Sequence, residues 1–171
     1  MEYVIKNNIE LEQIKLLKSI EGASSLRLYI EEVGEFALNL FIESHDRTIC
    51  IKNIPNIASD GDDYPKLIIE YVMTPSSDCE LLYEGNDFES ILILKDAITW
   101  EGDDISWKVE VDIGIKIVFQ QEQFLLLAQD SLAGLLKVFR LSTVPVEEVL
   151  ESYWSMKTDK IDSLIRKEMR V

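Results

Sequence analysis

The most regular stretch of the chain is WKVEVDIGIKIVF, which spans residues 107–119. From Trp107 onward every second residue is apolar, with charged residues or glycine between them and Val118 as the one departure. Successive side chains of a strand point to opposite faces of a sheet, so this period of two predicts a long β-strand with one face on a core and the other in water. Gly114 lies within the pattern, and we expect a bulge or a bend there.

Further strands are expected on either side of this one. Upstream, Ile98 and Trp100 lead into EGDD at residues 101–104, which predicts a hairpin with an acidic tip. Downstream, a polar turn at 120–123 leads into a more fully buried strand at 124–127. Alternation or β-type composition predicts the remaining strands at 26–30, 36–42, 48–52 and 67–73, with a turn at 44–47 and a loop at 53–65. Residues 132–141 fit a strand or a short helix equally well.

Helices are predicted at both ends of the chain. Asn8 is a plausible N-cap and Gly22 a plausible stop for a short N-terminal helix. Near the C-terminus, Pro145 suits a first helical position, and an apolar stripe follows at Val146, Val149, Leu150, Tyr153 and Trp154. A second stripe predicts another helix after Thr158, at Ile161, Leu164, Ile165 and Met169. The fold class is therefore predicted to be α+β, mainly antiparallel β-sheet with a short N-terminal helix and amphipathic C-terminal helices.

Length and composition indicate one domain, residues 1–171, with 47% hydrophobic residues to build a core. No apolar run is long enough to span a bilayer, and the first residues carry no apolar signal segment. We therefore expect a cytoplasmic protein that does not enter a membrane. Cys50 and Cys79 are expected to be reduced, Cys50 as a small core or sheet residue and Cys79 as a poor nucleophile between two carboxylates.

The acidic charge is concentrated in one third of the chain. The formal net charge is −15, and residues 60–112 hold 15 acidic and 3 basic residues, or −12. Residues 137–171 hold 6 acidic and 7 basic residues, or +1. A field of this sign repels nucleic acid and anionic membranes and attracts basic protein surfaces. The alternative is that these acids only solvate turns and keep the protein soluble.

No pattern of residues indicates catalysis or a cofactor. The single histidine, His45, lies in a predicted turn about 16 Å from Cys50, at about 3.3 Å per strand residue, which is too far for a catalytic pair. The segment SDGDD at 59–63 lacks the register and the final glutamate of a calcium loop. There is no phosphate-binding or nucleophile motif and no basic stripe for nucleic acid. We expect no enzyme activity, no cofactor, no metal site and no direct contact with nucleic acid.

These observations favour a binding protein whose partner is a basic protein. The leading hypothesis is an immunity-type inhibitor that neutralises a toxin or a nuclease by protein–protein contact. The expected partner-binding residues are Asp60, Asp62, Asp63, Trp100, Glu101, Asp103 and Asp104. Trp100 fits a core position better than an exposed anchor, although tryptophan is enriched in binding hot spots.

Three alternatives stay open on the sequence. A DNA mimic would space its carboxylates like phosphates along a ridge. A structural or assembly subunit would expose an apolar patch, and its acids would only solubilise it. An enzyme that uses carboxylates would hold a strongly shifted acid in a cleft.

Overall fold

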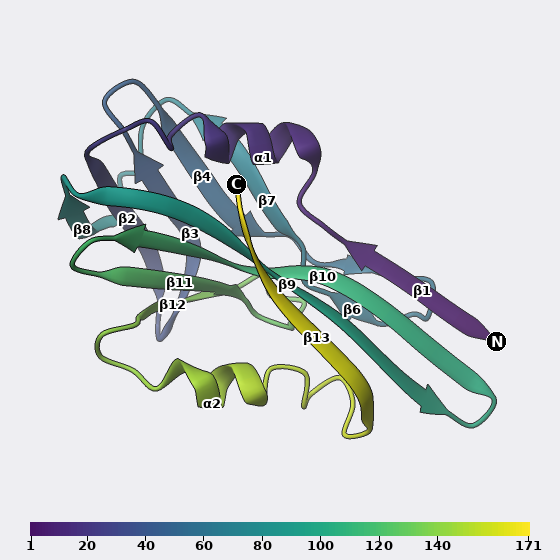
Figure 1. The fold of residues 1–171 in the computed structure, drawn as a ribbon. Coiled ribbons are helices and arrows are strands. Elements are labelled where there is room, and N and C mark those ends of the chain that lie inside the picture. Colours follow the sequence, from purple (N-terminus) through teal and green to yellow (C-terminus); the bar gives the residue numbers. More distant parts are fainter.

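The computed structural model describes residues 1–171 and is dominated by β-structure (Figure 1). The two helices are short: α1 (Leu11–Lys18) and α2 (Val146–Glu151). Thirteen strands make up most of the rest: β1 (Glu2–Asn7), β2 (Leu26–Val33), β3 (Phe36–Glu43), β4 (Thr48–Asn53), β5 (Asn56–Ile57), β6 (Asp63–Tyr64), β7 (Leu67–Val72), β8 (Glu80–Gly85), β9 (Phe88–Gly102), β10 (Ile105–Phe119), β11 (Gln123–Ala128), β12 (Leu136–Arg140) and β13 (Ile161–Arg170). The prediction of a mainly antiparallel β-sheet is confirmed.

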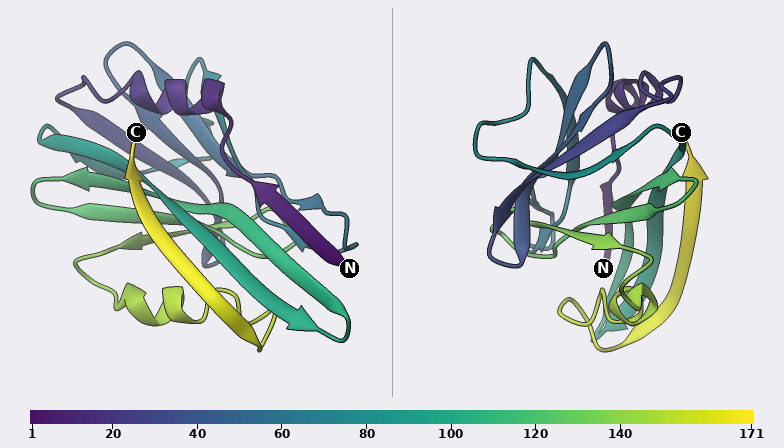
Figure 2. Two further views of the ribbon diagram at one scale, coloured as in Figure 1. Left: turned by 45° about the vertical axis from the view of Figure 1, so that its right-hand side comes forward. Right: turned by 90° about the vertical axis from the view of Figure 1, so that its left-hand side faces the viewer.

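The long β9–β10 hairpin organises the sheet. Strands follow one another in the order β13-β9-β10-β11-β12-β3-β2-β8, and all of these neighbours are antiparallel. β1 adds to the first half of β10 in parallel, while β4 and β7 extend the sheet beyond β3. A single pair, Leu136 with Ala37, joins the β9–β12 part to the β2–β4 part. Figure 2 shows these two parts as facing layers.

The chain has two apolar cores, one on each side of the β9–β10 sheet. The first core lies between the layers, beneath α1, and includes Leu28, Ile51, Ile93, Ile117 and Leu126. The second core lies on the opposite side, toward α2, and includes Ile98, Val111, Leu127, Phe139 and Trp154. Burying both faces of the central strands explains why β11 reads as an almost continuous apolar run.

A bulge in β10 transfers its side chains from one core to the other. Pairing with β9 runs to Asp112 opposite Lys95 and resumes at Gly114 opposite Leu94, which leaves Ile113 as an extra residue. Before the bulge the apolar residues lie in the second core: Val109, Val111 and Ile113. After the bulge they lie in the first core: Ile115, Ile117 and Phe119. The predicted strand and bulge are confirmed, but the expectation of one core face and one water face is wrong, because the bulge reverses the faces.

Glycine is required after the bulge by close packing. A Cβ atom at position 114 would lie 2.7 Å from the Leu126 carbonyl oxygen and 2.9 Å from a methyl carbon of Leu127. Gly114→Ala should therefore lower the free energy of unfolding by about 1–3 kcal/mol, the range for overpacking a well-packed interior. Urea unfolding measures the change. Gly22→Ala is the matched control, because a Cβ there has open space and the expected effect is within about 0.5 kcal/mol.

The predicted C-terminal helices need correction. Helix α2 ends at Glu151, although Tyr153 and Trp154 continue its apolar stripe through turns and pack on the second core. Residues 161–170 form strand β13, antiparallel to β9, where a second helix was predicted. Only one short helix is therefore present near the C-terminus. The second stripe has helical spacing, but the open edge of β9 supplies backbone partners that a helix at this place would leave unused.

Other expectations from the sequence are confirmed. The predicted N-terminal helix is present as α1, although Glu10 rather than Asn8 is its N-cap and it ends at Lys18, before Gly22; the hairpin of β3 and β4 encloses the predicted turn. Both cysteines are free, and burial raises the pKa of the Cys50 thiol to about 11. Strand β1, by contrast, lies ahead of the helix and was not predicted. Neither helix is long enough and apolar enough to cross a membrane.

Candidate partner-binding site

The tip of the β9–β10 hairpin carries three acids on a tight turn. Gly102 pairs with Ile105, so Asp103 and Asp104 form a two-residue turn between the strands. Asp104 adopts a positive φ of 60°, a conformation that aspartate tolerates better than most residues. Glu101, Asp103 and Asp104 are all exposed, and none of their carboxylates forms an ion pair. Their charge is therefore not neutralised by an ion pair within the chain.

An aromatic stack supports the tip from one face. Trp100 and Trp107 lie opposite each other across the hairpin, with ring centroids 5.4 Å apart and planes 11° apart. Tyr3 on β1 packs against Trp107 at 5.8 Å. Trp100 is only 7% exposed and belongs to the second core, so it anchors the hairpin and offers little surface to a partner. Trp107 is half-buried and is the more accessible of the two rings.

Strand β1 braces the other side of the tip. It runs parallel to β10, with Glu2 opposite Ser106 and Asn7 opposite Val111. The Met1 ammonium donates a hydrogen bond of 3.0 Å to the Asp104 carbonyl oxygen, and Ser106 N donates to the Met1 carbonyl at 2.9 Å. The turn is thus held by backbone contacts as well as by the ring stack, which fixes the path of its backbone.

Asp60 connects the preceding loop to the stack. Its Oδ2 accepts hydrogen bonds from the Trp107 indole nitrogen at 3.1 Å and from the Tyr64 hydroxyl at 2.7 Å. Burial raises the pKa of Tyr64, and the hydrogen bond to the Asp60 carboxylate raises it further, so this phenol keeps its proton. Asp60 is therefore committed to contacts within the chain, on the strand pair β5–β6 and the hairpin beside it.

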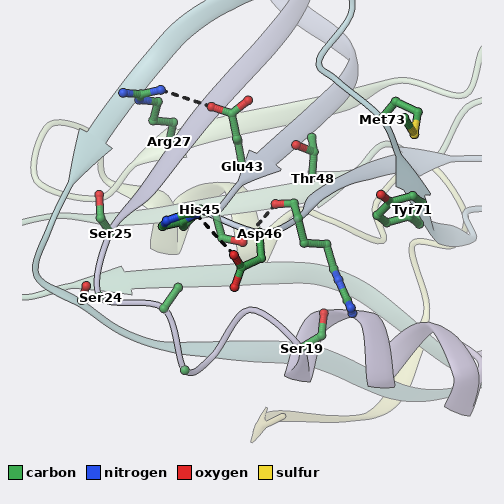
Figure 3. A pocket seen from close by; sticks show the side chains of 14 residues that line it. Ser19, Ser24, Ser25, Arg27, Glu43, His45, Asp46, Thr48, Tyr71 and Met73 are labelled. Carbon is green, nitrogen blue, oxygen red and sulfur yellow. Dashed lines mark hydrogen bonds and ion pairs between the residues drawn. The ribbon is translucent and has the colours of Figure 1, made fainter.

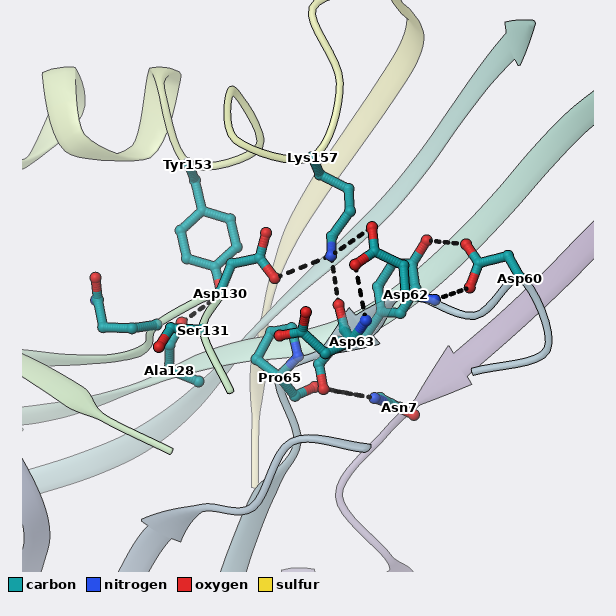
Figure 4. Close-up of polar contacts among 12 residues, drawn as sticks. Asn7, Asp60, Asp62, Asp63, Pro65, Ala128, Asp130, Ser131, Tyr153 and Lys157 are labelled. Carbon is teal, nitrogen blue, oxygen red and sulfur yellow. Dashed lines mark hydrogen bonds and ion pairs between the residues drawn. The ribbon is translucent and has the colours of Figure 1, made fainter. Parts of the chain in front are cut away.

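Asp62 and Asp63 belong to a polar cluster around Lys157 (Figure 4). The Lys157 side chain is 5% exposed, and its ammonium lies 3.2 Å from Asp62 Oδ2 and 3.3 Å from Asp130 Oδ1. It also donates a hydrogen bond to the Asp63 carbonyl oxygen and lies 4.3 Å from the centre of the Tyr64 ring. This one cation ties the loop of β5 and β6 to the turns that follow α2.

The surroundings of this cluster shift the pKa values of its carboxylates Asp62 and Asp130 in opposite directions. Partial burial would raise the pKa of Asp62, but hydrogen bonds from Lys157 and from the Asp63 backbone outweigh it and lower the pKa. Burial raises the pKa of Asp130 despite the attraction of Lys157. The cluster is therefore a structural ion-pair network with one poorly solvated acid in it.

Of the seven residues predicted from the sequence, three form an unneutralised surface. The tip acids Glu101, Asp103 and Asp104 are exposed, and we call them the acidic tip. The other four make contacts within the chain: Asp60 with Trp107 and Tyr64, the exposed Asp62 and the Asp63 carbonyl with Lys157, and Trp100 within the second core. Trp107 and Lys157 also hold this region together, and neither was among the predicted partner-binding residues. The position of Trp107 opposite Trp100 could have signalled its part in the stack, but no local signal links Lys157 to the loop.

The acids of residues 60–112 do not gather on one face. Asp96 and Asp112 are buried, while Glu80 and Glu84 lie on β8, the last strand of the sheet order. Glu70 and Glu110 form ion pairs with lysines of their own sheet. The charge surplus of the segment therefore divides into internal pairs, scattered surface acids and the acidic tip.

A large cleft lies elsewhere, between the α1–β2 connection and the β3–β4 turn (Figure 3). Its volume is about 940 Å³, and its lining is mostly polar, including Ser24, Ser25, Arg27, His45 and Arg47. The His45 ring is almost fully exposed and contacts only the neighbouring Asp46 carboxylate, at 3.3 Å. Its nitrogens form no hydrogen bond with a serine hydroxyl or a cysteine thiol.

Comparison of the chain with protein families, with curated proteins and with solved structures finds no match.

Proposed function

We propose that this chain is a cytoplasmic binding protein that neutralises a basic protein by contact through the acidic tip. An immunity-type inhibitor of a toxin or a nuclease is the case that fits best, and no catalytic role is assigned to the chain. The observation that supports the proposal is the set Glu101, Asp103 and Asp104, exposed and unpaired on a hairpin braced by the Trp100–Trp107 stack and by β1. Fixed charges of one sign accelerate the encounter with an oppositely charged surface.

The alternative of a DNA mimic is less well supported. Such a protein needs carboxylates along a continuous ridge, whereas the acids of residues 60–112 divide among β8, internal ion pairs and the tip. A short cluster at a hairpin end suits insertion into a cationic cleft better than coverage of a long nucleic-acid groove.

Neutralising the tip should slow association with the basic partner. The variant Glu101→Gln/Asp103→Asn/Asp104→Asn keeps the shapes of the side chains, and asparagine tolerates the positive φ at position 104. We expect the association rate at low salt to fall by about tenfold or more, and its dependence on salt to flatten. Stopped-flow mixing with the captured partner measures both quantities.

The matched control removes three charges from another surface. Glu147, Glu148 and Glu151 are exposed on α2 and form no ion pair, so Glu147→Gln/Glu148→Gln/Glu151→Gln changes the net charge by the same amount. A tip variant that associates as fast as this control would reject the acidic tip as the site.

A further inference from the structure

The last strand of the chain leaves one long edge of the sheet open. β13 pairs only with β9, and its ten residues contain neither proline nor glycine. Nine of its ten residues are exposed, including four large apolar residues at 38–56% exposure: Ile161, Leu164, Ile165 and Met169. An edge of this length, with free backbone N–H and C=O groups, is a template for another strand.

We propose that β13 pairs with β13 of a second copy of this chain, so that an antiparallel dimer continues the sheet across a two-fold axis. This inference does not depend on the proposed function, because β13 and the acidic tip are different surfaces. The second copy is favoured as the occupant by the charges of the strand itself, which read IDSLIRKEMR and complement one another when the sequence is reversed.

One register matches these charges. With the axis at Arg166, Asp162 of each copy comes level with Arg170 of the other, which gives two ion pairs by symmetry; Asp162 is the bulged residue that the pairing of β13 with β9 skips between Ile161 and Ser163. Arg170 is free to take part, since its side chain is 66% exposed and its ion pair with Glu21 is long, at 3.7 Å. The same register places Ile165 opposite Lys167, whose aliphatic stem can cover it.

The like charges at the axis are already neutralised. Arg166 turns inward, where Nε and Nη2 donate to the Asp96 carboxylate at 2.7 and 2.6 Å and Nη1 donates to the Leu150 carbonyl oxygen at 3.1 Å. Two such residues can therefore face each other across the axis without an exposed pair of cations. The neighbouring registers are worse, because an axis at Ile165 sets Asp162 opposite Glu168 and an axis at Lys167 sets two lysines opposite each other.

The surroundings of β13 also favour a second copy over a basic partner. Residues 137–171 carry a net charge of +1, so the edge itself does not add to the repulsion between two chains of charge −15. The strand at the other end of the sheet order, β8, has two glutamates and no basic residue, and self-pairing there would juxtapose like charges.

The test is a charge swap on the whole chain, read by sedimentation velocity over a concentration series. The wild-type chain should double its mass as the concentration rises. Asp162→Arg and Arg170→Asp should each raise the dimer dissociation constant by at least about tenfold, because each places like charges opposite one another twice. An equal mixture of the two variants should restore the dimer, since each introduced charge then meets its opposite.

The controls are Asp46→Arg and Arg47→Asp in the exposed β3–β4 turn, which should dimerise like the wild type. Circular dichroism and thermal melting establish that every variant is folded. A wild-type chain that stays monomeric overturns the proposal. A dimer that survives Asp162→Arg, or a mixture of the two variants that stays monomeric, overturns the β13 interface and its register.

Discussion

Arg166→Met should lower the free energy of unfolding by about 3–5 kcal/mol, the cost of leaving a buried charge without its partner. The Asp96 carboxylate is completely buried and receives two hydrogen bonds from Arg166 and one of 2.8 Å from the Trp154 indole nitrogen. The pair joins β9, β13 and the turns after α2, so its loss also loosens the cover of the second core. Urea unfolding at neutral pH measures the change.

The double variant Asp96→Asn/Arg166→Met distinguishes a buried charge from lost packing. Without the carboxylate no charge is stranded, and the asparagine oxygen can still accept from Trp154, so most of the lost stability should return. Lys167→Met is the matched control on the same strand, because Lys167 is exposed and forms no ion pair. It should change stability by no more than about 0.5 kcal/mol. A double variant as unstable as Arg166→Met would show that packing, not charge, accounts for the effect.

Lys157→Met should have the second largest effect, a loss of about 3 kcal/mol at neutral pH. The substitution removes the one cation that faces the Asp130 and Asp62 carboxylates and the Asp63 carbonyl oxygen. Burial already raises the pKa of Asp130, and without Lys157 this pKa should rise further. Thermal and urea unfolding at neutral and mildly acidic pH measure the loss.

The pH dependence of this stability loss follows from the pKa shifts of Asp130 and Asp62. An acid whose folded pKa is raised destabilises the fold above that pKa, and the penalty disappears as the acid binds a proton at lower pH. Asp62, whose pKa is lowered by Lys157 in the native chain, contributes stability above its ordinary pKa that is lost as the pH falls through its folded pKa. The difference between the native chain and Lys157→Met should therefore shrink on acidification. Lys160→Met, which removes an exposed unpaired lysine nearby, should show neither the loss nor the pH dependence.

The β9–β10 hairpin could be predicted from sequence because its signals are local. Alternation within residues 107–119 sets the strand, the EGDD segment sets the turn, and Gly114 marks the bulge. Which core each apolar residue of β10 contacts could not be predicted. The one extra residue of the bulge turns the later side chains to the opposite face of the sheet, while apolar and polar residues still alternate along the sequence. Only the pairing with β9 reveals that Ile113 is the residue left over.

The C-terminal segment could not be predicted because its apolar residues have helical spacing, while the interactions that favour a strand come from residues far away in the sequence. Ile161, Leu164, Ile165 and Met169 match a helical stripe, yet the strand is favoured by the edge of β9 and by a carboxylate 70 residues away, Asp96. The candidate site likewise has one part that local sequence predicts and one part that depends on distant residues. The exposed tip acids follow from a local turn pattern, whereas the internal role of Asp62 depends on Lys157, 95 positions further along the chain.

The most direct test of the acidic tip is affinity capture from the native host, with mass spectrometry, at low and high salt. Three baits are compared: the native chain, Glu101→Gln/Asp103→Asn/Asp104→Asn, and the α2 control Glu147→Gln/Glu148→Gln/Glu151→Gln. The expected result is a basic protein that the native chain and the α2 control retain at low salt, that high salt releases, and that the tip variant does not retain. Capture of the same proteins by the tip variant and the native chain would contradict the proposed function.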